Sequence, residues 1–135
     1  MKLNQTNAYA IAAMGYIVNA PAGQLVANSE ICKAGKMPTR YVIQLMRKLV
    51  TAELLVGVRG VTGGYKLAKP ANKITLLEIV EAIEGPVGLN GRVELPVMSR
   101  NSKTAVEGAF AAVEADAPKR LAAVTLSDLR AAKAA

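Results

Sequence analysis

Cationic and amide side chains recur on one face of the segment that follows Met37, and their types suit contacts with nucleic acid. Arg40, Gln44 and Arg47 follow one another at helical spacing, with Lys48 beside them. Guanidinium and amide groups form paired hydrogen bonds with base edges, and ammonium groups neutralise phosphates. The alternative for such a face, considered alone, is a solvated helix surface.

A second group of such residues follows directly, on a predicted hairpin over 55–68. Val56 and Val58 alternate with Gly57 and Arg59, which is strand spacing, and GVTGG supplies the turn. A glycine-rich turn lets backbone N–H groups approach phosphates, and an arginine on it can enter a narrow minor groove. An ordinary hairpin turn explains the glycines alone, but the adjacent arginine and basic helix favour nucleic-acid binding.

Residues for catalysis or metal binding are scarce. The chain has no histidine and one cysteine, which removes the commonest general base, the usual metal ligand and any disulfide framework. Glu78, Glu81 and Glu84 are interpreted as a solvated helix face rather than an acid–base group. The glycines at 60–64 lack the Gly-Lys-Ser/Thr of a phosphate loop. We therefore expect neither an enzyme nor a cofactor or metal.

The positive charge is concentrated in the first half of the chain. Residues 1–70 contain nine Lys and Arg against two Asp and Glu, which gives +7, and residues 71–135 are balanced at eight of each. A localised basic field is typical of a polyanion partner. With no long apolar run and no signal-peptide pattern, a cytoplasmic protein without membrane association is expected, nucleoid-associated when bound to DNA.

Two of the three helices predicted before the hairpin are well defined by their apolar spacing. The first spans residues 4–20. The third spans 38–52 and is the predicted recognition helix of a helix-turn-helix. Its inner face is expected to carry four core residues: Val42, Leu45, Met46 and Leu49.

The helix between them is predicted over 29–34. Asn28 or Ser29 is the expected N-cap, and Gly35 the expected residue just beyond its C-terminal end. Cys32 lies inside this helix. A small buried thiol is favoured there over a reactive cysteine.

The second half begins with a helix over 76–84, opened by a capping box of Thr75 and Glu78. A loop follows over 86–103, and an alanine-rich helix starts at Thr104. Pro118 is expected to interrupt it, with Asp116 capping the restart. Thr125 to Asp128 predicts a last capped helix. The amphipathic helix should pair with its copy in a second subunit, through one apolar face: Val106, Ala109, Phe110 and Val113.

Several of these segments together resemble the Rrf-two family of bacterial winged-helix regulators. The matching features are MKLNQTNAYAI at the start, Ile31 with Met37-Pro38, the run RGVTGGYKLAKPANKITLLEIVEAIEG from Arg59 to Gly85, and VTLSDL from Val124. The resemblance implies a homodimeric DNA-binding repressor on an imperfect palindrome. Recognition helices would enter major grooves, and Arg59 a minor groove. It also allows a small-molecule effector, or an adaptor whose DNA binding is set by docking to a metabolic enzyme.

Three positions depart from the family pattern. The best-known members hold an iron–sulfur cluster through three cysteines in the segment corresponding to 86–103, and none is present here. Glu53 replaces a common glycine after the recognition helix. If Glu53 must adopt a left-handed conformation, it costs about 1 kcal/mol relative to glycine. Ile43 stands where the cluster-assembly regulator uses a glutamate, so the base preference should differ.

The predicted fold is therefore mostly α with a small β-hairpin (α+β): a winged helix-turn-helix over 1–85 and a loop with a dimerisation helix over 86–135. The expected partners are double-stranded DNA and a second copy of the chain. The expected DNA contacts are these: Lys2, Asn28, Ser29, Thr39, Arg40, Tyr41, Gln44, Arg47, Lys48, Arg59, Gly60, Thr62, Gly63 and Lys66.

Overall fold

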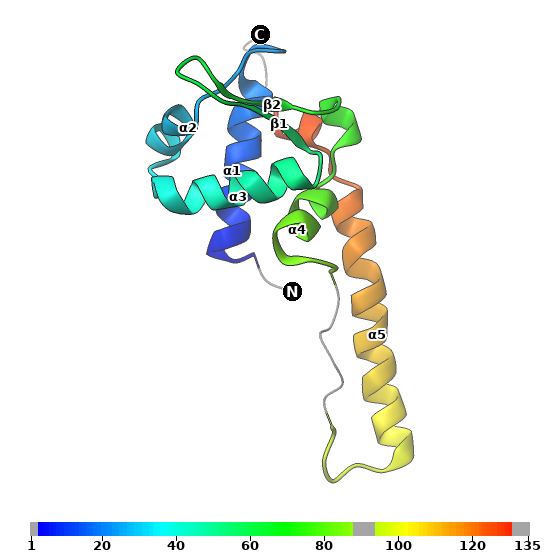
Figure 1. Ribbon diagram of the computed structural model, residues 1–135. Helices are drawn as coiled ribbons and strands as arrows, with labels where there is room; N and C mark the ends of the chain where they lie inside the picture. The colour runs from blue at the N-terminus through cyan, green and yellow to red at the C-terminus, as the bar shows by residue number, and fades with distance from the viewer. Residues whose placement is uncertain (1–2, 88–93, 131–135) are drawn as a thin grey trace.

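The structure is a computed structural model that describes residues 3–87 and 94–130. Helices dominate it, and one antiparallel hairpin is the only sheet in the described residues, which confirms the predicted fold class. Figure 1 shows a globular body from which one long helix extends. The elements in order are α1 (Gln5–Asn19), α2 (Asn28–Gly35), α3 (Thr39–Thr51), β1 (Leu55–Val58), β2 (Gly64–Leu67), the 3-10 helix η1 (Ala71–Lys73), α4 (Leu76–Glu84), the long helix α5 (Arg100–Ala122) and the 3-10 helix η2 (Leu126–Leu129).

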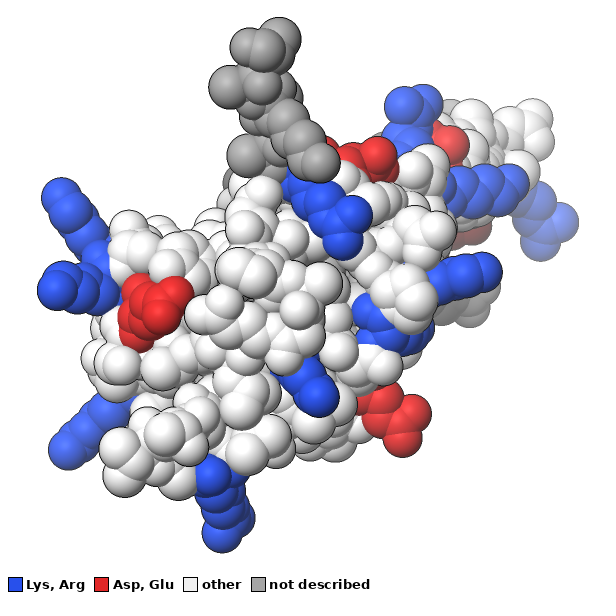
Figure 2. Space-filling model, turned by 90° about the horizontal axis from the view of Figure 1, so that it is seen from above, with Lys and Arg blue, Asp and Glu red and all other residues white. Residues whose placement is uncertain are grey.

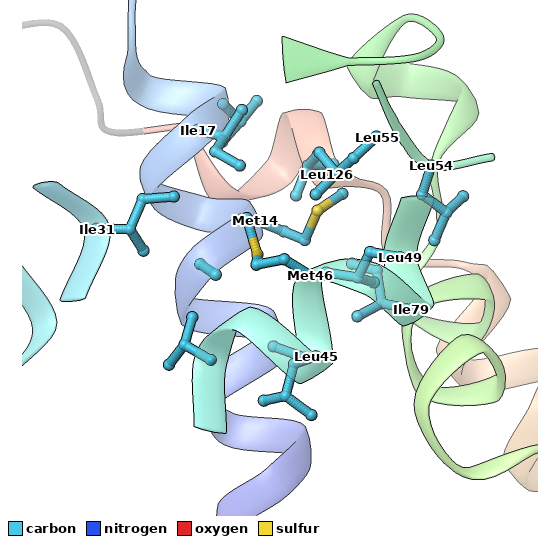
Figure 3. Packing of buried hydrophobic residues seen from close by; sticks show 14 of the residues in the cluster. Met14, Ile17, Ile31, Leu45, Met46, Leu49, Leu54, Leu55, Ile79 and Leu126 are labelled. Carbon is cyan, nitrogen blue, oxygen red and sulfur yellow. The ribbon is translucent and has the colours of Figure 1, made fainter. Parts of the chain in front are cut away.

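The core of the body forms around α3, whose predicted inner face is confirmed. Its four apolar residues are buried, and they pack with α1, α4 and the hairpin. In Figure 3, Met14 of α1 and Met46 of α3 lie side by side at the centre of this cluster. Leu126 of η2 is also fully buried there, so the C-terminal part of the chain contributes to the same core. Each such Leu or Met contributes about 1.5–3 kcal/mol by leaving water.

Both predicted ends of α2 are wrong. Ala27 is the N-cap, without a side-chain hydrogen bond, and Lys36 rather than Gly35 is left-handed, at φ 51°. Gly35 is still helical, and the buried side chain of Met37 packs against it. A Cβ on Gly35 would lie 2.8 Å from Met37 Cε. The chain turns one residue later than expected, and the Met37 N–H donates to the carbonyl of Cys32 at 2.9 Å.

The turn from α3 into the hairpin contains the strained residue that the sequence indicated. Glu53 is left-handed, at φ 63°. Its N–H donates to the carbonyl of Val50 at 2.9 Å, and the next N–H, of Leu54, donates to Leu49 at 3.0 Å. These bonds and the burial of Leu54 hold the turn. The left-handed conformation of Glu53 costs about 1 kcal/mol relative to glycine at the same position.

The segments after the hairpin join the two halves of the chain. The capping box of α4 is confirmed: Glu78 N–H donates to Thr75 Oγ1 at 3.1 Å, and Thr75 N–H to Glu78 Oε1 at 3.2 Å. Next to it, the N–H of Leu126 donates to the carbonyl of Ile74 at 2.7 Å. The predicted cap before η2 is also present, between Thr125 and Asp128.

Two predictions for α5 are wrong. The helix begins at Arg100, four residues early, because the Ser99 hydroxyl accepts a hydrogen bond from the Ser102 N–H at 3.2 Å. It then continues through Pro118 without a restart. Asp116 caps nothing. Its carboxylate accepts a hydrogen bond from Arg120 Nε one turn later, which links the residues on either side of the proline. Within the described ranges, no helix is both long and apolar enough to cross a membrane.

Candidate nucleic-acid interface

An open hollow of about 820 Å³ lies between the start of α2, the second half of α3 and the tip of the hairpin. It brings together six residues that the sequence analysis proposed from separate segments. They are Asn28 and Ser29 from α2, Arg47 from α3, and Arg59, Gly60 and Gly63 from the turn. Both arginines are exposed. The hollow is therefore open to solvent and carries two positive charges.

The turn that presents Arg59 depends on its glycines in two different ways. Gly60 is at φ 115°, a conformation that other residues rarely adopt, and its carbonyl accepts the N–H of Gly63 at 3.0 Å. Gly63 does not have a positive φ. A Cβ there would lie 2.1 Å from the carbonyl oxygen of Val58, so close backbone approach explains this glycine.

The hairpin is fixed to the start of α2 through its second strand. Val26 and Tyr65 exchange two backbone hydrogen bonds, each of 2.9 Å, in an isolated bridge. Gly64 permits this contact, since a Cβ on it would lie 2.5 Å from the Val26 carbonyl oxygen. The start of α2 has no side-chain cap, so its first N–H groups and its helix dipole suit a phosphate. The bridge therefore holds the start of α2 and the hairpin at the edge of one hollow.

The outer face of α3 continues the surface beyond the hollow. Thr39, Arg40 and Gln44 are exposed on the first turns of the helix, as predicted, and Thr62 is exposed in the turn of the hairpin. At 13 residues, α3 is about 20 Å long, enough to lie in a major groove. Figure 2, which views the molecule from above, shows scattered Lys and Arg on the upper face with fewer Asp and Glu among them.

Three of the other predicted contacts are engaged elsewhere in the structure. The Tyr41 ring is half-buried against Tyr9 in an edge-to-face pair at 5.7 Å, and its hydroxyl is hydrogen-bonded to that of Thr6. The Lys48 ammonium donates to the carbonyl of Ile83, near the end of α4, at 3.3 Å. Lys66 lines a different pocket, and Lys2 lies outside the described residues.

The sequence analysis did not propose the apolar residues of this surface. Ile43 and Val50 of α3 and Val58, Val61 and Tyr65 of the hairpin also line the hollow. Val61 is fully exposed in the turn. A β-branched apolar residue in a solvent-exposed turn is a signal that could have identified it.

Comparison with known proteins gives a consistent result. The model of a protein family, described as "Rrf2: Iron-dependent Transcriptional regulator", matches residues 3–132. The regulator IscR of Cereibacter sphaeroides is 40% identical over 89 residues, which cover 64% of this chain and 57% of that protein. The solved structure of CymR, the global cysteine regulator of B. subtilis, superposes with a TM-score of 0.78 at 23% identity, covering 96% of this chain and 95% of that one. T. potens IscR gives 0.64 at 23% identity, covering 96% and 85%.

The donor residues of this chain do not fit the iron that the family description names. A cluster of the kind held by cysteines needs several thiolates. The single cysteine, Cys32, is 5% exposed inside α2, and its sulfur contacts the Asn28 side-chain amide at 3.6 Å. Histidine is absent from the sequence, and the described residues contain no group of three or more side chains able to hold a metal.

Proposed function

Because the chain belongs to the Rrf2 family of transcriptional regulators, we propose that it is a homodimeric repressor that binds an imperfect palindrome in bacterial DNA, in the cytoplasm, without an iron–sulfur cluster. In this proposal α3 enters the major groove, and the turn between β1 and β2 enters the adjacent minor groove. The start of α2 contacts the phosphate backbone between them.

The observation that carries the proposal is the hollow itself. It places an uncapped helix start, Arg47 and Arg59 around one concave surface, and the polar face of α3 extends it. Arg40 and Gln44 are free to reach base edges, since both are exposed on that face. Arg47, which lines the hollow, is the proposed phosphate contact. These roles remain predictions for each residue.

The proposal of a dimer rests on α5. The helix buries no residue completely, and Figure 1 shows it extending from the body, which it contacts through α4. Phe110 is 56% exposed and Val113 66% exposed. Ala109 and Gly108 beside them permit close approach of a second helix. The same face of a second copy is the simplest cover for these side chains.

The test of DNA recognition starts from a pool of random duplexes. Fragments retained by the protein should share two inverted half-sites. With the selected site in hand, Arg47→Ala should weaken binding to specific and scrambled duplexes alike and lower the slope of log affinity against log salt by about one unit, because one phosphate contact is lost. Binding titrations at several salt concentrations measure both. Retained fragments without a common sequence would refute the proposal.

The proposed absence of a cluster predicts colourless protein. Protein purified without oxygen should contain no stoichiometric iron, because one buried cysteine cannot supply the thiolates of a cluster. Cys32→Ala should leave DNA affinity unchanged in the same titration. Elemental analysis and the absorbance spectrum check the first statement. Stoichiometric iron bound to the wild type and lost in Cys32→Ala would contradict it.

A further inference from the structure

A second pocket, of about 520 Å³, also borders the hairpin and shares no lining residue with the first hollow. Its apolar wall includes Ile17 and Val18 near the end of α1 and Leu67 of β2. This volume lies in the range of pockets that hold small molecules. The pocket is built from three remote parts of the chain: the end of α1 with the segment after it, the stretch from β2 to η1, and the residue that follows η2.

The charged groups of this pocket are all cations. Lys66, Lys69 and Arg130 line it, and among its described lining residues none is Asp or Glu. Lys69 is paired with Glu78 at 2.6 Å. No side-chain hydrogen bond or ion pair is observed for Lys66 or Arg130 in the described part of the chain. Two unpaired cations beside an apolar wall suit an anion that carries an apolar part.

The backbone of Arg130 is held at the pocket by contacts of η2 with the end of α1. The Asn19 side-chain amide, in the last turn of α1, donates to the carbonyl of Leu129 at 3.3 Å, and the N–H of Arg130 donates to Ser127 at 3.3 Å. Leu126, in the same short helix, is fully buried. The guanidinium therefore starts from an anchored backbone, which lowers the entropy lost when it binds an oxyanion.

The same two segments form walls of both cavities. Residues 20–24 line the second pocket and lead through Val26 to the start of α2. Lys66 and Leu67 follow Tyr65 in β2, and Val26 and Tyr65 are joined by the two-bond bridge. A ligand in the second pocket would contact the chain directly beside both partners of that bridge. Its charge would also neutralise cations close to the hairpin.

We propose that this pocket binds a small monocarboxylate with a short apolar chain, and that its occupancy lowers affinity for DNA. The carboxylate lies between Lys66 and Arg130, and the chain lies against Ile17, Val18 and Leu67. The regulatory part rests on the proposed DNA-binding function. The binding part does not, because it concerns the free protein.

Calorimetric titration of the full chain, without DNA and at constant ionic strength, tests the binding. The probes are sodium acetate, sodium hexanoate, inorganic phosphate and hexylamine hydrochloride. Hexanoate should bind at least about tenfold more tightly than acetate, since four more methylenes leave water. Hexylamine, of equal length and opposite charge, should not bind. If phosphate binds as tightly as hexanoate, the pocket is a general oxyanion site. That result would overturn the apolar part of the proposal.

Matched variants locate the site. Lys66→Gln and Arg130→Gln should each weaken hexanoate binding by about tenfold, the loss of one hydrogen bond to a charged group. Ala22→Phe, at an exposed lining position, should fill the pocket and block hexanoate without a change in charge. Lys73→Gln is the control, because Lys73 is an exposed lysine of η1 outside the lining. Thermal unfolding of each variant verifies folding.

The outcomes separate the two parts. No saturable heat with hexanoate up to about 10 mM, or equal effects of Lys66→Gln and Lys73→Gln, overturns the pocket. Saturating hexanoate should weaken binding of the selected DNA by about fivefold or more, and the DNA should weaken hexanoate binding by the same factor. Hexanoate binding with unchanged DNA affinity overturns the regulatory part alone. If Lys66→Gln weakens DNA binding and no carboxylate binds, the lysine is a phosphate contact and the proposal fails.

Discussion

Phe110→Asp is expected to convert the proposed dimer to a monomer. Phe110 is the largest apolar side chain on the exposed face of α5. A covered aromatic side chain buries about 150–250 Å² of its surface. A carboxylate at the same place would lie unpaired between two apolar helices. Burial of an unpaired charge costs several kcal/mol per copy, and a two-fold interface contains the residue twice.

Light scattering at micromolar concentration measures the change directly. Phe110→Ala, which removes the ring without adding charge, should cost roughly 3 kcal/mol if the ring is fully covered in the dimer. Ala115→Asp is the matched control. Ala115 is exposed on the opposite side of α5 by helical spacing, so the same carboxylate there should leave the dimer intact.

The monomeric variant should also lose DNA affinity. One subunit reaches one half-site only, and the gain from linking two half-site contacts, on the order of a hundredfold or more, disappears. The selected palindrome and a single half-site should then bind with similar affinity. A wild-type protein that stays monomeric at micromolar concentration contradicts the proposed interface, and so does a Phe110→Asp variant that remains dimeric.

Two local features were predictable from a short stretch of sequence. The spacing of Val42, Leu45, Met46 and Leu49 defines the buried face of α3, and Thr75 with its partner three residues later defines the start of α4. These features depend on the helical period and on reciprocal hydrogen bonds within one turn. Tertiary packing does not change either of them.

Some errors occur where packing decides, and others, such as the start of α5 at the Ser99 cap, where a local signal was missed. Lys36 is left-handed, and Met37 beside it packs into the core against Gly35, a contact that helix propensity does not express. Pro118 removes one hydrogen bond from α5, but the rest of the helix continues around it.

For the candidate site, the residue types were predictable and some of their positions were not. Arg59 lies where the strand alternation and the glycine-rich turn indicated. Lys48 is on the exposed side of α3 by its spacing, yet its ammonium is bound to the end of α4, a contact with a segment 35 residues away. The proposed carboxylate pocket depends on such distant contacts, since Lys66, Arg130 and the end of α1 line it from separate parts of the chain. No motif in the sequence marks it.

Arg59→Ala is expected to weaken DNA binding, and the loss should be largest for sites with A·T-rich sequence beside each half-site. Such sequence narrows the minor groove and deepens its negative potential, which attracts an arginine. The turn that presents Arg59 is fixed by the glycine at φ 115° and by the close approach of Gly63 to Val58, so the side chain is presented from a defined backbone. Loss of its charged hydrogen bonds should weaken the preferred site by about tenfold or more.

Gln44→Ala should have a different signature from Arg59→Ala. An amide on the exposed face of α3 pairs with adenine in the major groove, worth about 1–3 kcal/mol against the wrong base. Its loss should relax specificity at one or two positions in each half-site and leave the flanking preference intact. Arg100→Ala, at the start of α5 and far along the chain from the hollow, is the charge-matched control for Arg59→Ala and should change neither. Titration of all three against the selected site, a site with G·C-rich flanks and a scrambled duplex separates these effects. If Arg59→Ala and Gln44→Ala both keep the wild-type preference among the three duplexes, then α3 and the β1–β2 hairpin do not read DNA. The positive charge of this surface then requires another explanation.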